Sequence, residues 1–344
     1  MSRLSRRDFH RLAAAGAAAL GAPALVRAQP RKVKVGVLLP RSGYLAKIGQ
    51  SCQMGADIAP ALVKQMYGVD IELMNADFES KVEEARARAE KLVDDGAQVL
   101  VGAFDSGATA AIAQVAEQRK VPFVVNIAAA PQITKQGYKY VVRNFPTAPQ
   151  LVHNGLALFR DLFQATGTAP RKAVFMHVND TFGQAMTGGI KATLPKLDYL
   201  PFKIVEEIGY DPAARDLSVE VAKAKASGAD FVMLVCRLND AILLVREMVR
   251  QRFTPMGVVS PGSPGMYEQA FYESLGKYSE YCISNVPWYD PKAKITKLVE
   301  GQNDDIASAC IQNLNLRPTV VLPAASAEHK PVFPMPGWGK VEKS

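Results

Sequence analysis

The chain has 344 residues, of which 48% are hydrophobic and 22% are charged. This is the composition of an ordinary globular protein, and the length suggests about two domains. The formal net charge is +8, but five arginines and one aspartate lie in the first 28 residues, so the remainder carries +4. Its lysines and arginines are scattered without a long basic block, so a nucleic-acid-binding protein has little support.

The first 28 residues contain the three parts of an export signal. Residues 5–11 (SRRDFHR) include a twin arginine, residues 12–25 form an apolar run, and residues 26–28 (VRA) are typical of a cleavage site. The apolar run is too short to span a bilayer comfortably, and no later segment predicts a membrane span. We therefore expect a twin-arginine signal peptide over residues 1–28, and a mature protein that begins at Gln29 and works outside the cytoplasm.

Apolar runs alternate with helical patterns in the first half of the mature chain. Strands are predicted at residues 33–39, 71–74, 99–101 and 123–125. Helices are predicted at residues 49–67, from a capping box formed by Ser80 and Glu83 to Gly96, and at residues 108–119. The strands are continuously apolar rather than alternating, so both faces of their sheet should be covered, as in a parallel sheet built from βαβ units.

The same alternation repeats after Pro146 and Pro149, which interrupt the pattern. Strands are predicted at residues 173–178, 202–208 and 231–236, and helices at residues 183–194, 215–227 and 239–251. Two consecutive sets of this kind predict an α/β protein with two doubly wound parallel-sheet lobes. From residue 301 onward the chain is rich in Asn, Gln and Pro, which predicts an atypical, poorly ordered tail.

Signatures of catalysis are mostly absent, because the sequence contains no HExxH, GxSxG or GxGxxG motif. Residues 102–109 have the spacing of a P-loop, but Ala108 stands where the phosphate-binding lysine should be. A Ser-Gly turn at a helix N-terminus still favours a small anion such as a carboxylate, which makes Ser106 a candidate ligand contact. The alternative is that Ser106 only caps its helix. We expect neither a metal nor a cofactor.

Two further candidates follow strands of the second lobe. Phe182 lies at the start of a helix and could present an aromatic ring to a cleft. Arg237 follows the strand at residues 231–236, where a guanidinium could bind a ligand carboxylate in bidentate fashion. The alternative for Arg237 is a surface pair with Asp240. The four cysteines form no CxxC pair, and their pattern leaves open both disulfides and small buried thiols.

A set of short motifs in a fixed order resembles the periplasmic solute-binding proteins of ABC transporters, of the branched-chain amino acid type. These motifs lie between residues 33 and 291 and comprise residues 35–43 (VGVLLPRSG), Gly49, residues 55–56 (GA), 101–102 (VG), Ser106, residues 121–123 (VPF), 130–131 (AP), 138–143 (YKYVVR), 182–183 (FG), 216–218 (DLS) and 229–232 (ADFV).

The resemblance implies a type I periplasmic binding protein fold, with two lobes joined by hinge strands that close on a ligand. It assigns residues 29–145 to lobe 1, residues 146–261 to lobe 2, and residues 262–300 to a return into lobe 1, with the atypical tail at residues 301–344. It also implies a periplasmic protein that is not an enzyme and that delivers its ligand to ABC permease subunits in the inner membrane, without nucleic acid or cofactor. A ligand-sensing module for a receptor would use the same cleft and remains an alternative.

The resemblance also implies individual binding residues. Ser106 matches the serine that holds the ligand carboxylate, Ile127 matches a backbone contact, and Phe182 matches an aromatic contact. Ala129 stands where the family has a threonine that helps hold the amino group. Arg237 stands at a second aromatic position.

Pro261 stands at the position of the acidic residue that pairs with the ligand's ammonium group, so the usual partner of an amino acid is missing. Asp105 or Asp240 could substitute for it, but neither is at the usual place. With Arg237 adding positive charge, the sequence predicts a small apolar carboxylate, either aromatic or aliphatic, with branched-chain amino acids as the alternative. Its apolar part would lie against Phe182 and the loop that carries Tyr44, Lys47 and Ile48.

Overall fold

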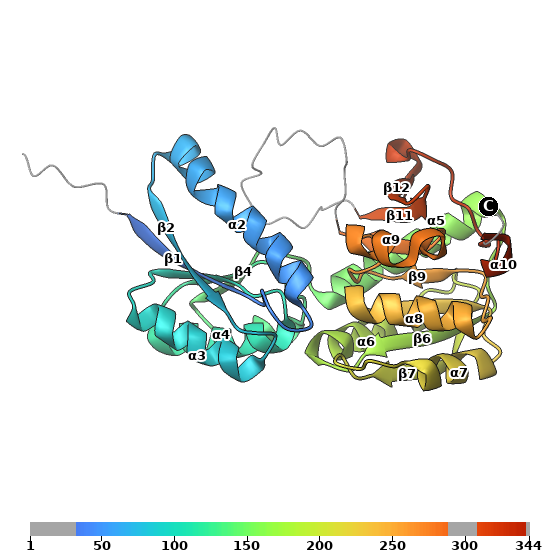
Figure 1. Cartoon of the computed structure of the whole chain (residues 1–344), viewed down its shortest axis with the longest axis horizontal. Helices are drawn as coiled ribbons and strands as arrows, with labels where there is room; N and C mark the ends of the chain where they lie inside the picture. Colours follow the sequence, from blue (N-terminus) through green and yellow to red (C-terminus); the bar gives the residue numbers. More distant parts are fainter. Residues whose placement is uncertain (1–31, 288–307, 342–344) are drawn as a thin grey trace, which may run out of the picture.

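The computed structural model describes residues 32–287 and 308–341, which form two α/β lobes side by side (Figure 1). The predicted signal peptide lies outside the described residues. No helix in this described part is both long enough and apolar enough to cross a bilayer.

Lobe 1 is built on a five-stranded parallel sheet with the order β2-β1-β3-β4-β5. Its strands are β1 (Val33–Leu39), β2 (Ile71–Asp77), β3 (Val99–Gly102), β4 (Phe123–Val125) and β5 (Val141–Arg143). Its helices are α2 (Ala46–Tyr67), α3 (Val82–Asp94), α4 (Ser106–Arg119) and the 3₁₀ turn η1 (Pro131–Ile133). Helix α2 ends at Gly68 in the left-handed conformation, as predicted.

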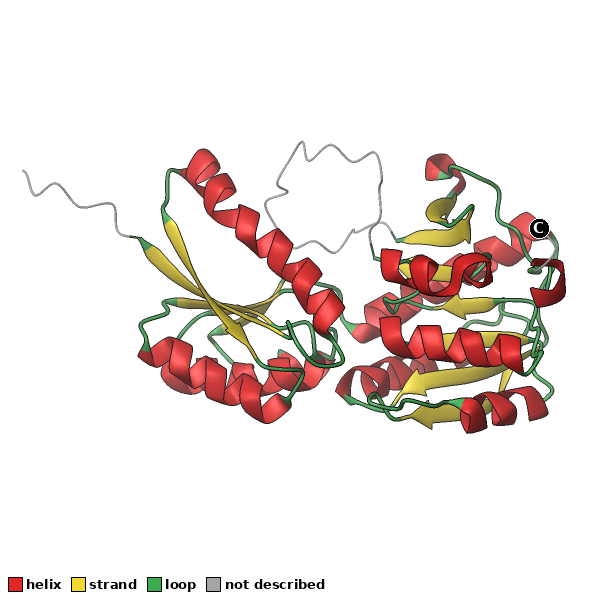
Figure 2. Cartoon of the chain, viewed as in Figure 1, coloured by secondary structure: helices red, strands yellow, loops and turns green. Residues whose placement is uncertain are grey.

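Lobe 2 is built on a seven-stranded sheet with the order β12-β11-β10-β9-β8-β6-β7. Helices flank the strands of this lobe (Figure 2). Its strands are β6 (Lys172–Val178), β7 (Lys203–Tyr210), β8 (Phe231–Val235), β9 (Val258–Ser260), β10 (Ile283–Val286), β11 (Ala309–Leu314) and β12 (Arg317–Leu322). Its helices are α5 (Ala148–Thr166), α6 (Thr181–Thr193), α7 (Ser218–Ala226), α8 (Leu238–Arg250), α9 (Gln269–Leu275) and α10 (Trp338–Val341), with the 3₁₀ turns η2 (Leu194–Lys196), η3 (Gly276–Ser279) and η4 (Ala324–Ser326).

The parallel strands of the two sheets follow the same order. In lobe 1 the first strand lies between the second and the third, and in lobe 2 strand β6 lies between β7 and β8 in the same way. The order in which strands are added to the sheet therefore reverses between β1 and β3 in lobe 1, and between β6 and β8 in lobe 2. In open α/β sheets, ligands bind outside the carboxyl ends of the strands at such switch points.

The described part of residues 262–300 does not return to lobe 1, so this expectation is wrong. Strand β10 pairs in parallel with β9 and antiparallel with β11, which places it inside the sheet of lobe 2. Its four residues are all buried there.

The expectation of a poorly ordered tail is also wrong for residues 308–341, whereas residues 301–307 lie outside the described part. Strands β11 and β12 form a hairpin that extends the sheet of lobe 2, with Asn315 and Leu316 in left-handed conformations at its turn. Further on, Phe333 packs against the rings of Phe163 and Phe231, and Trp338 donates a hydrogen bond to the carbonyl of Phe253. These buried side chains order a segment that its prolines suggested was irregular.

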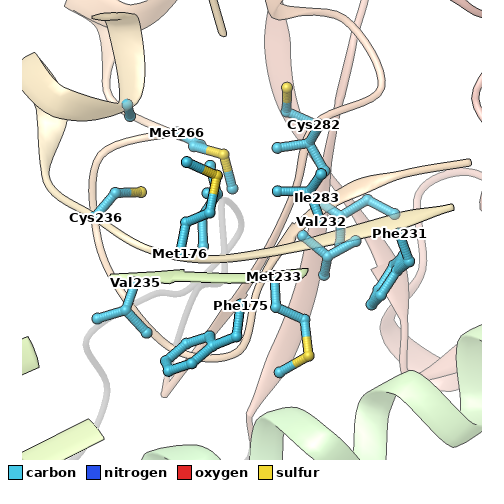
Figure 3. Packing of buried hydrophobic residues seen from close by; sticks show 14 of the residues in the cluster. Phe175, Met176, Phe231, Val232, Met233, Val235, Cys236, Met266, Cys282 and Ile283 are labelled. Atoms are coloured by element: carbon cyan, nitrogen blue, oxygen red, sulfur yellow. The ribbon is translucent and has the colours of Figure 1, made fainter. Parts of the chain in front are cut away.

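The core of lobe 2 is apolar on both faces of the sheet, as the continuous strand patterns predicted. Figure 3 shows part of it, where Phe175, Met233 and Val235 lie on one side of the strands, and Met176, Cys236 and Met266 lie on the other. All four cysteines are free thiols, and Cys52 is the one among them that is not buried. Of the two alternatives, small unpaired thiols are therefore the one observed.

Lobe 1 is covered unequally. Helices α3 and α4 cover one face of its sheet, whereas α2 lies on the other (Figure 1). Gly49 is the one buried residue of α2, and exposed apolar side chains at four-residue spacing line this helix: Met54, Ile58, Leu62 and Met66. The capping box predicted for α3 does not form, because Lys81 precedes the helix without a side-chain cap, and Ser80 bonds instead to the backbone of Ser42 and Leu45.

Candidate ligand-binding site

Three helices begin at the facing edges of the two lobes, where strands β3, β6 and β8 end. Asp105 is the N-cap of α4, and its carboxylate accepts a hydrogen bond from the Ala108 N–H at 2.8 Å. Asp180 is the N-cap of α6, and its carboxylate accepts from the Gly183 N–H at 2.9 Å. Arg237 precedes α8 in the same position. A short apolar strand followed by a polar residue and a helix thus places each of these side chains at the cleft.

Arg237 joins the other two residues. Its Nη1 lies 2.5 Å from an Asp180 carboxylate oxygen, and its Nη2 lies 3.3 Å from an Asp105 oxygen. The guanidinium also lies over the ring of Phe182, at 5.3 Å from the centroid, and near the ring of Phe104, at 6.0 Å. Arg237 is only 7% exposed. The alternative of a surface pair between the Arg237 side chain and Asp240 is therefore wrong. We name the contact set Asp105–Arg237–Asp180 the inter-lobe bridge.

Asp240 lies beside the inter-lobe bridge and accepts two hydrogen bonds. One oxygen accepts from the Arg237 backbone N–H at 2.8 Å, and the other accepts from the Tyr210 hydroxyl at 2.7 Å. Burial raises the pKa of Asp240 to about 6, even though these hydrogen bonds and the Arg237 charge lower it. Burial also raises the pKa of Asp105, against the opposing effect of Arg237. The site thus holds acidic groups whose charged forms are destabilised by loss of water.

A cavity of about 190 Å³ lies between the lobes, next to Arg237. Its walls are mostly apolar and come from both lobes, and they comprise Ile48, Phe104, Ile127, Ala129, Phe145, Leu151, Phe182, Arg237, Gly262, Ser263, Pro264, Tyr267, Val286 and Pro287. None of these described lining residues is Asp or Glu. Elsewhere in residues 32–287 and 308–341, no cluster of His, Cys, Asp or Glu is arranged to hold a metal ion.

Five of the predicted site residues line this cavity: Ile48, Ile127, Ala129, Phe182 and Arg237. Tyr44 and Lys47 line a smaller adjoining space, which also contains Glu268 and Asn239. Asp105 is not in the cavity wall, but it reaches the site through its ion pair with Arg237.

Ser106, the predicted contact of the ligand carboxylate, is buried and does not line the cavity. Ser106 is the first residue of α4, after the capping Asp105, so it is not the N-cap of its helix. Its hydroxyl is buried and has no hydrogen-bond partner among the residues that the structure describes. The alternative role as a simple cap is therefore wrong, whereas the contact of this hydroxyl with a ligand stays a prediction.

Pro261 is not among the residues that line the cavity, although its neighbour Gly262 is. A Cβ added at Gly155 would lie 2.0 Å from the Pro261 carbonyl oxygen, so helix α5 packs directly on this backbone. Gly183 packs in the same way, because a Cβ there would lie 1.6 Å from the Val178 carbonyl oxygen. This close approach of α6 to the end of β6 explains the glycine of the predicted Phe182–Gly183 motif.

Sequence reasoning missed several residues of the site. Phe104 and Phe145 line the cavity, and Asp180 pairs with Arg237, although none of them was a candidate. Asp180 lies two residues before Phe182, at the carboxyl end of a strand, and this position was the available signal. Tyr267 and Val286 belong to the segment expected in lobe 1, so no pattern suggested that they face the cleft.

Comparisons with known proteins agree on one family. A family model described as "Periplasmic binding protein" matches residues 32–305. The Leu/Ile/Val-binding protein homolog 8 of Brucella abortus is 25% identical over 236 residues, which cover 67% of this chain and 58% of that protein. An amino acid binding protein of Pseudomonas aeruginosa is 28% identical over 229 residues, covering 64% of this chain and again 58% of the relative. The chain thus spans less than two thirds of the length of these relatives.

Solved structures share the fold. A leucine binding protein from Thermotoga maritima has a TM-score of 0.66 at 22% identity, with 76% of this chain and 72% of that chain covered. A solute-binding protein of an ABC transporter from R. palustris, solved in complex with 4-hydroxybenzoate, has a TM-score of 0.63 at 21% identity, with 76% and 70% covered. At these identities the likeness concerns the fold, which matches the predicted two-lobed α/β architecture.

Proposed function

Because this chain belongs to the periplasmic binding protein family, we propose that it is the solute-binding component of an ABC importer and not an enzyme. Its lobes close over one small apolar carboxylate in the periplasm and present it to permease subunits in the inner membrane. The observation that carries this proposal is the apolar cavity between the lobes, at the switch points of both sheets. Hinge closure around a ligand at such a place is a known means of sequestering small molecules.

The size and lining of the cavity support a ligand with one ring or a branched chain. Its volume of about 190 Å³ is slightly larger than the ~150 Å³ cavity that accepts benzene in an engineered protein. The rings of Phe104, Phe145 and Phe182 offer flat apolar contact on several sides. An aromatic acid with one ring, or an aliphatic acid of similar size, matches both properties.

The polar groups support a carboxylate without an amino group. The unpartnered hydroxyl of Ser106 and the start of α4 offer hydrogen-bond donors and a positive helix end to an anion. An ammonium group would find no carboxylate among the described residues that line the cavity, and a buried unpaired charge is costly. Branched-chain amino acids remain the second candidate, because relatives are named for leucine, isoleucine and valine.

Competition calorimetry with the mature protein tests the ligand class. We expect benzoate or 4-hydroxybenzoate to bind more tightly than leucine, isoleucine or valine. The Ser106→Ala variant should weaken binding of the acid by about 1–2 kcal/mol, the magnitude of a hydrogen bond to a charged group. The control is Ser218→Ala, since Ser218 is likewise the first residue of a helix, but this helix, α7, is not one of the three that begin at the facing edges of the lobes. Tight binding of leucine with no response to any acid that lacks an amino group would contradict the proposal.

Export belongs to the same proposal. The twin arginine at Arg6 and Arg7 supports export of the folded chain to the periplasm. Replacing both with Lys should leave the precursor in the cytoplasm, as detected by fractionation and N-terminal sequencing. Normal export of this variant would exclude the twin-arginine route.

A further inference from the structure

Arg237 forms an ion pair with one carboxylate from each lobe. Asp180 caps α6 in its own lobe 2, whereas Asp105 caps α4 in lobe 1. The guanidinium therefore connects the lobes directly, with Nη2 lying 3.3 Å from the Asp105 carboxylate. This pair is buried, with side-chain exposures of 8% for Arg237 and 10% for Asp105.

A second polar contact between the lobes starts on the same turn of α8. The side-chain amide of Asn239 donates a hydrogen bond to the backbone carbonyl of Tyr44 at 2.9 Å. The starts of α4 and α6 also meet, because a Cβ added at Gly107 would lie 3.4 Å from the Thr181 hydroxyl. The lobes are thus in direct contact beside the cavity, and Arg237 takes part in that contact.

The ion pair between Arg237 and Asp105 stabilises the closed arrangement of the lobes. In the closed arrangement the buried guanidinium is neutralised from both sides, and its pKa is raised because Asp180 and Asp105 outweigh the effect of burial. Separation of the lobes would remove Asp105 from Arg237 and leave Asp180 as its partner. Breaking one side of a buried, hydrogen-bonded ion pair is costly unless water replaces the lost partner.

We propose that the inter-lobe bridge holds the two lobes closed whether or not a ligand is bound. In this proposal Asp105 is the partner that breaks away on opening, and Asp180 orients the guanidinium within lobe 2. A ligand then enters through the minor population in which Arg237 and Asp105 are apart, as expected when a bound state is already populated in the free protein. The proposal does not depend on which ligand the cavity accepts.

Small-angle X-ray scattering of the ligand-free mature protein tests this proposal with two matched variants. Asp105→Asn and Asp180→Asn each remove one charge from the same guanidinium, and Asn keeps the N-capping oxygen of its helix. We expect the wild type to be compact, Asp105→Asn to show a larger radius of gyration, and Asp180→Asn to remain as compact as the wild type. Circular dichroism verifies that each variant is folded.

Three results would overturn the proposal: a wild type as expanded as Asp105→Asn, no expansion in Asp105→Asn, or equal expansion in both variants. If Asp105→Asn does not fold, Asn239→Ala replaces it, since this change removes the neighbouring contact with Tyr44 without touching a helix cap on lobe 1. A larger radius of gyration of this variant would support the proposal that contacts from the start of α8 hold the lobes closed, and an unchanged radius would contradict that proposal.

Discussion

Asp240 should make the protein less stable above pH 6 than an uncharged side chain would at the same place. Burial raises its pKa from 3.8 to about 6, so the folded protein binds a proton at this carboxyl more tightly than the unfolded chain does. A folded-state pKa above the unfolded value contributes stability below pH 4, and this contribution is lost as the pH rises through 6. The difference corresponds to about 3 kcal/mol.

The Asp240→Asn variant isolates this effect. Asn can still accept the hydrogen bond from the Arg237 backbone N–H. Its amide can donate to the Tyr210 hydroxyl, which then donates to the Val235 carbonyl, an acceptor that it already reaches at 3.1 Å. The geometry is therefore kept while the buried charge is removed. We expect the variant to be more stable than the wild type at pH 8, by at most about 3 kcal/mol, with the difference vanishing near pH 4.

Thermal melts of wild type and variant at several values between pH 4 and pH 8 measure this difference. For a domain of this size each kcal/mol shifts the melting temperature by roughly 2–4 °C, so the effect is well resolved. The exposed Asp198 provides the control, because Asp198→Asn should leave the melting temperature unchanged throughout. A destabilised Asp240→Asn protein at pH 8, or a difference that does not vary with pH, would refute the reasoning.

Three other expectations concern packing, exposure and proton linkage. Gly183→Ala should lower the free energy of unfolding, measured with denaturant, by several kcal/mol, because its Cβ would overlap the Val178 carbonyl. The control is Gly188→Ala on the same helix, whose Cβ would meet nothing within 4 Å and which should stabilise the protein by about 0.4–1 kcal/mol. Ile58→Glu on α2 should change stability by no more than about 0.5 kcal/mol, whereas the same change at buried Ile112 should be strongly destabilising. Equal losses would mean that the exposed apolar side chains of α2 are covered. Binding of a carboxylic acid should be accompanied by proton uptake and should strengthen as the pH falls. Burial already raises the pKa of Asp105, and a ligand anion nearby should raise it further. Calorimetry in two buffers of different ionisation enthalpy measures this proton uptake, and the absence of any proton exchange would contradict the expectation.

The two-lobed architecture could be predicted because its signals are local. Continuous apolar runs such as residues 33–39 and 231–236 require cover on both faces, and the helices between them fix parallel pairing. The same regularity placed Phe182 and Arg237 just beyond the carboxyl ends of strands β6 and β8, as the structure has them.

The C-terminal hairpin could not be predicted in this way. Its strands are short, and prolines at residues 318 and 323 border or interrupt the second of them. What orders the segment is long-range packing, such as Phe333 against Phe163 and Phe231 and the Trp338 bond to Phe253. Contacts between residues so far apart in the chain leave no periodic pattern at either end.

The role of Arg237 shows where local reasoning stops. Asp240, three residues away, was the obvious partner, but it binds the Arg237 backbone, while the guanidinium binds carboxylates 57 and 132 residues earlier in the chain. Those two carboxylates are N-caps of α4 and α6, so the side chains that satisfy two helix ends also neutralise a cation that belongs to a third helix. A change at Asp105 or Asp180 therefore alters helix capping and the contact with Arg237 together. Asn substitutions separate the two effects, because they retain the capping oxygen and remove only the charge.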